Sequence, residues 1–203
     1  MQRFVLLENI KLLTKRLALV TTDEDRQRVR TILTAMEREL TLLDSAETGA
    51  LSGGGVDDAA IQAELIARFR ATFEDWPQIA YLIDPAPGLH FVAVNAAFEE
   101  ATGLTRDRIE GQPLFSLFPD NPDDPSAHGA WMIFASMRKV AETGQADHMA
   151  PFRYDVRDAE GVFVERYWRH ANTPVFDADG RLVFLQHLAD EVTEEILNAR
   201  RSA

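Results

Sequence analysis

Two histidines near the C-terminal end of the sequence are the side chains best suited to chemistry. His170 and His187 fall in two successive segments with the composition of β-strands, and Asn172 lies close to the first of them. Neutral imidazoles bind metals, and together with an amide they can orient a polar ligand. Two histidines alone do not define a metal site, so we predict none. A pair of hydrogen-bonded structural histidines is the alternative interpretation.

Catalytic motifs are absent from the sequence. It contains no G-x-S-x-G, no H-E-x-x-H and no glycine-rich nucleotide-binding turn. Glu99 and Glu100 are adjacent, so on a helix they diverge and cannot act as a facing acid–base pair. The chain has no cysteine, which excludes thiolate zinc sites, iron–sulfur clusters and cysteine nucleophiles. We therefore predict a protein that is not an enzyme.

The charge of the chain bears on its partners. Among 203 residues, 21 are Lys or Arg and 33 are Asp or Glu, a formal net charge of −12. Such a surface repels phosphate backbones and anionic lipid headgroups, so we expect neither nucleic-acid nor membrane partners. No apolar run approaches the length of a membrane span, and the N-terminus does not resemble a cleaved signal peptide. These features favour a cytoplasmic protein.

The elements that must position the histidines follow two amphipathic segments at the N-terminus. Apolar residues recur there at spacings of three and four, with a capping sequence between the segments, which predicts an α-helical hairpin over residues 1–46. A hairpin has a thin core, so its seam either pairs with a second copy in a homodimer or packs on its own domain. The candidate dimer-interface residues are Leu6, Ile10, Leu13, Leu17, Val29, Leu33, Met36 and Leu40.

The rest of the chain divides by composition and periodicity. Residues 47–58 have the composition of a flexible linker, and 59–76 show the period of a helix that leads into a main domain over 77–194. That domain follows the order β-β, helices, β-β-β, with the third strand expected from about 149 to 157. The last strand is apolar on both faces, so the N-terminal helices or a partner must cover one of them. Residues 195–203 are expected to form a short tail, with no effector domain attached.

Three sequence blocks resemble a known family. YLIDPAPGLHFVAVNAAFEEATG, FPDNPDDP and RYWRHANTPVFDADGRLVFLQHLADEVTE together resemble the PAS sensory fold, most closely the bacterial domains that precede sensor histidine kinases. The resemblance covers about residues 75–196. It implies an α+β domain: a five-stranded antiparallel sheet with helices on one face, enclosing a pocket, here preceded by the helical hairpin.

The resemblance also implies site residues. Its geometry directs both histidines, with Trp168 and Asn172, towards the helix-covered face. On a long helix predicted over 126–142, Trp131, Phe134 and Met137 recur at a spacing near three, and they either line the pocket or form plain core. The candidate pocket residues are Trp131, Phe134, Met137, Tyr154, Trp168, His170, Asn172 and His187. The EVTE sequence resembles the Asp-Val-Thr-Glu signature through which the last strand passes its signal to an output helix. The corresponding signal-relay candidates are Asp190, Glu191, Thr193 and Glu194.

No residue requires a cofactor. Some PAS domains hold heme through a histidine on the long helix, but His128 and His148 lie at the ends of that predicted helix. Flavin photochemistry of the LOV type is not expected, because the reactive cysteine of that family has no counterpart in this chain, whereas no residue argues for or against flavin bound without that adduct.

The function that we expect is a sensory module that binds a small ligand or a protein partner and relays a conformational change through flanking helices. A homodimer and a histidine kinase or response-regulator partner are the expected assemblies. Two alternatives stay open: a redox or gas sensor that carries heme or flavin, and a pure dimerisation or interaction adaptor.

Overall fold

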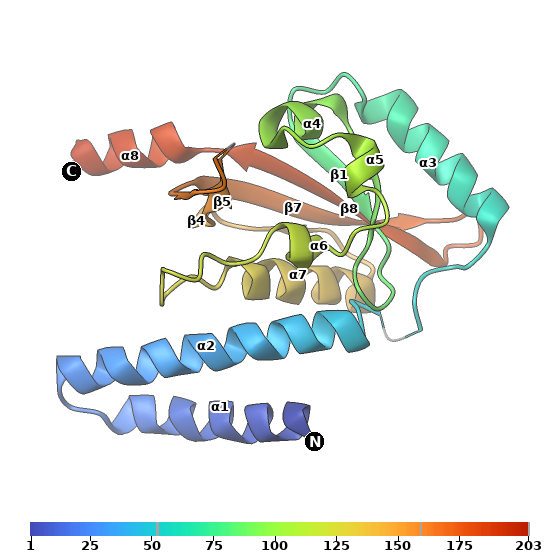
Figure 1. Ribbon diagram of the computed structural model, residues 1–203. Helices are drawn as coiled ribbons and strands as arrows, with labels where there is room; N and C mark the ends of the chain where they lie inside the picture. Colours follow the sequence, from blue (N-terminus) through green and yellow to red (C-terminus); the bar gives the residue numbers. More distant parts are fainter. Residues whose placement is uncertain (52, 159, 203) are drawn as a thin grey trace.

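The computed structural model describes residues 1–51, 53–158 and 160–202. Its elements form layers, with the α1–α2 hairpin stacked below α7, the sheet above α7, and α3 on the far side of the sheet (Figure 1). The helices are α1 (Gln2–Leu19), α2 (Asp23–Glu47), α3 (Ala59–Phe73), α4 (Ala96–Thr102), α5 (Arg106–Ile109), α6 (Leu114–Leu117), α7 (Gly129–Thr143) and α8 (Thr193–Arg201). The strands are β1 (Ile79–Ile83), β2 (Phe91–Val94), β3 (Asp147–His148), β4 (Phe152–Arg153), β5 (Val156–Arg157), β6 (Phe163–Val164), β7 (Tyr167–Phe176) and β8 (Leu182–Glu191).

The sheet is antiparallel, in the order β2-β1-β8-β7-β3. β4 also pairs with β7, along the same edge as β3, so the sheet is five strands wide and the predicted α+β fold class is confirmed. In place of the single strand expected over 149–157, the structure has the short strands β4 and β5 within that range and β3 just before it. Pro151 lies at the break, where it lacks the N–H that a continuous ladder needs. β5 pairs with β6 in a separate hairpin.

Apolar clusters fill both faces of the sheet. On the inner face, Ile83, Phe91 and Leu185 pack beneath the helices α4 to α7. On the outer face, Leu82 and Phe184 pack against α3. The resemblance implied helices on one face of the sheet, with the N-terminal helices or a partner covering the other, and α3 supplies that cover. This packing explains why β8 is apolar on both sides.

The N-terminal hairpin packs on its own domain. The side chain of Thr22 caps α2 by accepting a hydrogen bond from the Asp25 N–H at 3.2 Å. α2 lies along α7 (Figure 1), and the Arg38 guanidinium donates to the backbone carbonyls of Asp124 and Ala127, just before α7. The eight candidate dimer residues are buried or half-buried within the single chain, in which α1 packs against α2 and α2 against α7. The seam is therefore covered within one chain.

The segment predicted as a flexible linker, 47–58, lies against the main domain. The Ala50 N–H donates to the Pro85 carbonyl at 2.9 Å, and the Val56 N–H donates to the Leu182 carbonyl at 3.0 Å. At Gly55 a Cβ atom would lie 2.2 Å from the Val183 carbonyl oxygen, so this close approach requires glycine. The glycines serve close packing here, as well as bending the chain. Residue 52 of this segment and residue 203 of the predicted tail lie outside the described residues.

Candidate functional site

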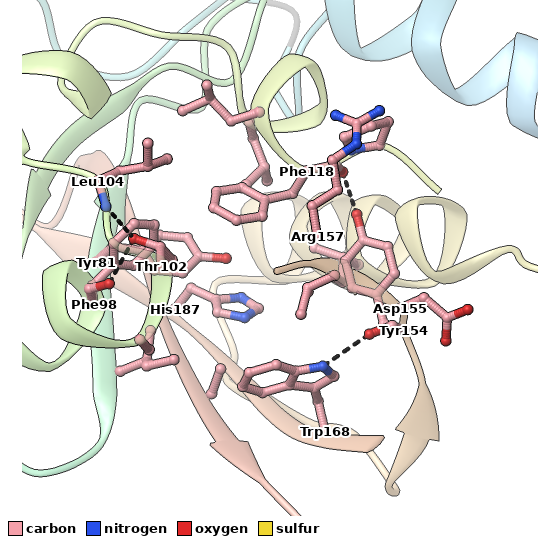
Figure 2. Close-up of a pocket in the computed structure, with 18 of the residues that line it drawn as sticks. Tyr81, Phe98, Thr102, Leu104, Phe118, Tyr154, Asp155, Arg157, Trp168 and His187 are labelled. Carbon is pink, nitrogen blue, oxygen red and sulfur yellow. Dashed lines mark hydrogen bonds between the residues drawn. The ribbon is translucent and has the colours of Figure 1, made fainter. Parts of the chain in front are cut away.

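A cavity of about 300 Å³ lies between the inner face of the sheet and the helices that cover it. Strands β1, β7 and β8 form its floor, and α4, α6, α7 and the β5–β6 hairpin form its walls. This volume is at the lower end of the range for small-molecule sites. Most of its lining is apolar or aromatic, and Figure 2 shows Phe98, Phe118 and Trp168 around the central space.

Aromatic rings form the rigid part of the wall. The Tyr81 ring stacks on the His187 ring with centroids 4.6 Å apart. The Trp168 indole N–H donates to the Tyr154 carbonyl at 2.9 Å, and the Tyr154 hydroxyl donates to the Phe118 carbonyl (Figure 2). These bonds connect β7, the segment after β4 and the loop before α7, which fixes the shape of the cavity on that side.

A continuous line of hydrogen bonds runs from the protein surface to this cavity. We call it the polar chain; its members are Lys139, Asp147, Ser136, Asn172, His187 and His170. Its successive distances are 2.5 Å from Lys139 Nζ to Asp147 Oδ1, 2.7 Å from Ser136 Oγ to Asp147 Oδ2, 2.8 Å from Asn172 Nδ2 to Ser136 Oγ, 2.7 Å from His187 Nδ1 to Asn172 Oδ1, and 2.8 Å from His170 Nδ1 to His187 Nε2.

Burial at the inner end and hydrogen bonding at the outer end set the charges of the polar chain. Burial lowers the pKa of His170 to about 3, and it holds the pKa of His187 well below the usual value, with the nearby His170 adding to the effect. Hydrogen bonds from Lys139 and Ser136 lower the pKa of Asp147. At neutral pH the polar chain therefore has an ionised carboxylate near its outer end and two neutral imidazoles at its inner end.

Four of the eight predicted pocket residues line the cavity: Tyr154, Trp168, His170 and His187. Asn172 lies one step behind them, fully buried, and orients His187 through its amide oxygen.

Three residues of α7 lie elsewhere. Trp131 is 43% exposed and, with Phe134, lines a groove between α7 and the hairpin, whereas Met137 is buried in the inner core. α7 contributes Ile133 to the cavity instead. Because α7 packs against the sheet on one side and against α2 on the other, it has apolar residues on both sides. The spacing near three therefore selected residues that do not line the cavity.

Several cavity residues were missed from the sequence. They are Tyr81, Phe98, Phe118, Ile133 and Phe163. The alternation in 79–83 places Tyr81 on the same face as Ile79 and Ile83, which is a usable signal. Phe98 and Phe118 lie on or beside helices of only a few residues, too short to show a period.

The signal-relay candidates lie where β8 ends and α8 begins. The Asp190 carboxylate accepts a hydrogen bond from Gln78 at 2.7 Å, and Glu191 forms an ion pair with Arg166 at 3.1 Å. The Thr193 hydroxyl accepts a hydrogen bond from the Tyr167 N–H at 3.0 Å, whereas Glu194 is exposed. Asp190 and Glu191 thus tie the end of β8, and Thr193 the start of α8, to neighbouring strands or to the residues just before them.

The described residues contain no group of three or more His, Cys, Asp or Glu side chains arranged to hold a metal ion. His128 and His148, the candidates at the ends of the long helix, are exposed and do not line the cavity.

Comparison with known proteins agrees with this architecture. A family model described as "PAS fold" matches residues 73–196, more than half of the chain. The chain belongs to the PAS family. The predicted resemblance is confirmed, and the fold is that of a sensory signalling module. In the part of the chain that the structure describes, no helix is long and apolar enough to cross a membrane.

Three solved PAS and LOV structures are similar to this chain at low identity. The PAS domain of a protein from Colwellia psychrerythraea is 14% identical, over 64% of this chain and 98% of that one, with a TM-score of 0.47. A LOV protein from Rhodobacter sphaeroides is 18% identical, over 66% and 69% of the two chains, with the same TM-score. An RNA-binding LOV receptor is 19% identical over 70% of this chain, with a TM-score of 0.47. The match spans only 36% of that receptor's length.

Proposed function

We propose that this PAS domain senses a small ligand bound in its cavity and passes the change to its flanking helices, without catalysis. The observation that carries the proposal is a largely apolar cavity lined by His170, a buried polar side chain whose Nε2 has no protein partner among the described residues. A buried polar atom without a partner is costly, and a bound molecule can remove that cost. A cytoplasmic protein with a histidine kinase or response-regulator partner is the setting we infer.

Two features support a route from the cavity to α8. His187 contacts the cavity from β8, and β8 continues directly into α8. Thr193, at the first position of α8, accepts the backbone N–H of Tyr167 at the start of β7. A ligand that prefers one arrangement of β7 and β8 shifts the population of α8 positions by its difference in affinity.

The experiment is a thermal-shift screen of small aromatic and aliphatic molecules against the wild type and Ala189→Leu. Ala189 lines the cavity, so the larger side chain fills space that a ligand needs. A ligand at 100 times its Kd stabilises the folded state by about 2.7 kcal/mol. We expect shifts in the wild type that disappear in Ala189→Leu and persist in Ala46→Leu, which changes an exposed position of α2. Equal shifts in all three proteins, or none in the wild type, would contradict the proposal.

Pairing of two copies is the second part of the proposal. Because the predicted seam is covered inside the hairpin, we place the pairing surface on the outer side of α1. There the exposed residues Val5, Leu12 and Leu19 recur every seven positions, as in a coiled-coil stripe. The acidic net charge still argues against nucleic acid as a partner.

The test of pairing is mass measurement by light scattering at tens of micromolar protein. Leu12→Asp should give a monomer, because it places a charge on the stripe. Glu39→Asp, an acidic-for-acidic change at an exposed position of α2, should leave the dimer unchanged. A monomeric wild type contradicts this part of the proposal and leaves ligand binding untouched.

A further inference from the structure

The polar chain has a direction, and the direction is set at its outer end. Asp147 is an ionised carboxylate, which can only accept hydrogen bonds. The Ser136 hydroxyl lies 2.7 Å from Asp147 Oδ2 and therefore donates its proton to the carboxylate. The Ser136 oxygen is left to accept, and the Asn172 amide N–H donates to it at 2.8 Å.

The same logic extends to the two histidines. With the Asn172 N–H turned towards Ser136, its carbonyl oxygen faces His187 Nδ1, which must carry a proton to donate. A neutral imidazole has one N–H, so His187 Nε2 carries a lone pair. His170 Nδ1 lies 2.8 Å from that lone pair and must donate to it. The one proton of His170 is then used, and its Nε2 is an acceptor.

That last acceptor has no protein partner. His170 is only 5% exposed, and its Nε2 is buried without a hydrogen bond in the described part of the protein. Its aromatic neighbours offer no donor: the Phe152 ring has none, and the Trp168 N–H is already bonded to the Tyr154 carbonyl. The His170 ring lines the cavity. A lone pair at the wall of a largely apolar cavity selects what can bind there.

We propose that His170 Nε2 is the hydrogen-bond acceptor of the ligand site, and that the ligand is a small, largely apolar molecule carrying an N–H or O–H donor. This inference rests on the proposed ligand-binding function and adds the chemical class of the ligand. The volume of about 300 Å³ and the aromatic walls suit a molecule of one or two rings. A molecule of the same shape without a donor leaves Nε2 unpaired and binds more weakly.

The first test measures the tautomers directly in the ligand-free wild type. Nitrogen NMR of protein labelled with ¹⁵N-histidine distinguishes a protonated ring nitrogen from an unprotonated one. We expect both His170 and His187 to carry their proton on Nδ1 at neutral pH. A proton on His170 Nε2 overturns the inference whatever binds, and this measurement needs no variant to fold.

The second test compares two probes of nearly identical shape, indole and benzofuran, which differ by the replacement of an N–H with an oxygen. We expect indole to bind the wild type about tenfold more tightly by calorimetry, the worth of one net hydrogen bond. In His170→Phe the preference should vanish. His148→Phe, which changes an exposed histidine outside the cavity, should keep it.

The outcomes separate the two proposals. Equal binding of both probes to the wild type overturns the donor requirement but leaves the cavity as a ligand site. Binding of neither probe at millimolar concentration contradicts the ligand-binding proposal itself. If hemin binds with an absorption band that His170→Phe abolishes, the lone pair holds iron, and the proposed ligand class is wrong.

Discussion

The two faces of the sheet share their strands but differ in what they bury. The outer face packs Leu82, Phe184 and other apolar side chains against α3. The inner face buries apolar residues too, but it also holds His170, Asn172 and His187 and a cavity. Both faces receive alternate residues of β8, so the same strand serves packing on one side and a polar site on the other.

The difference shows which face of this fold can bury the polar side chains of a ligand site. Buried polar groups destabilise a protein unless they are hydrogen-bonded, and the outer cluster avoids the problem with apolar residues alone. The inner face solves it by connecting each polar group to the next until the polar chain reaches Lys139 near the surface. One atom, His170 Nε2, is left over on the side of the cavity.

The largest expected effect is on the outer face. Phe184→Ala removes a buried ring between the sheet and α3, and it should lower the free energy of unfolding by about 3–5 kcal/mol. Urea denaturation measures this loss. Phe4→Ala changes an exposed ring on α1 and should stay within about 0.5 kcal/mol of the wild type. Similar losses in both variants would mean that the outer face is not a packed core.

A smaller loss is expected when the polar chain is cut. His187→Leu leaves the Asn172 carbonyl and the His170 N–H without their partners, and each unpaired buried group costs about 1–3 kcal/mol. With each of the two groups in the lower part of that range, we expect a total loss of roughly 2–4 kcal/mol by urea denaturation. His148→Leu, at an exposed histidine, is the matched control. An unchanged stability of His187→Leu would show that the polar chain does not stabilise the inner face.

The pH dependence of stability should reveal a further difference between the two faces of the sheet. The folded-state pKa of His170 is lowered to about 3, so between pH 6.5 and 3 the unfolded chain takes up a proton that the folded protein does not. The contribution of neutral His170 to the free energy of unfolding is therefore complete above about pH 6.5. It is lost as the pH falls below that value, by up to about 1.4 kcal/mol per pH unit. Unfolding curves from pH 6.5 to 5 measure the slope. It should be shallower in His170→Phe and unchanged in Phe184→Ala; equal slopes in all three proteins would contradict the buried neutral state.

The smallest effect is expected at the outer end of the polar chain. The Lys139 side chain is 62% exposed, and exposed ion pairs contribute about 0–1 kcal/mol. Lys139→Met should therefore lower the melting temperature only slightly, while Ser136 still holds Asp147. A loss of stability as large as that of His187→Leu would mean that the polar chain depends on the charge of Lys139.

Much of the fold was visible in the sequence because period and capping are local properties. Thr22 marks the turn of the hairpin, and the alternation around His170 and His187 brings those side chains to one site. The failures involve information that is not local. The glycine-rich stretch around Gly55 has a linker composition, yet close contact with Val183 determines its place.

Half of the predicted pocket residues line the cavity, and local periodicity again explains which ones could be predicted. Strand positions such as Trp168 follow from a period of two. The α7 residue that lines the cavity, Ile133, could not be separated from Trp131, because the hairpin makes both sides of α7 suitable for apolar residues. Nothing in the linear sequence near Ser136 shows that it would bridge Asn172 and Asp147.

The continuity of β8 has a mechanical consequence. The strand is paired with β1 on one side and β7 on the other, so its backbone is already extended and held along both edges. Such a strand behaves as a stiff rod that cannot stretch. From His187 to the end of β8 at Glu191 the strand runs for roughly 13 Å, at about 3.3 Å per residue, and α8 begins two residues later. A displacement of the His187 backbone would therefore reach α8 as a slide or a twist of the whole rod, with little loss of amplitude along the way.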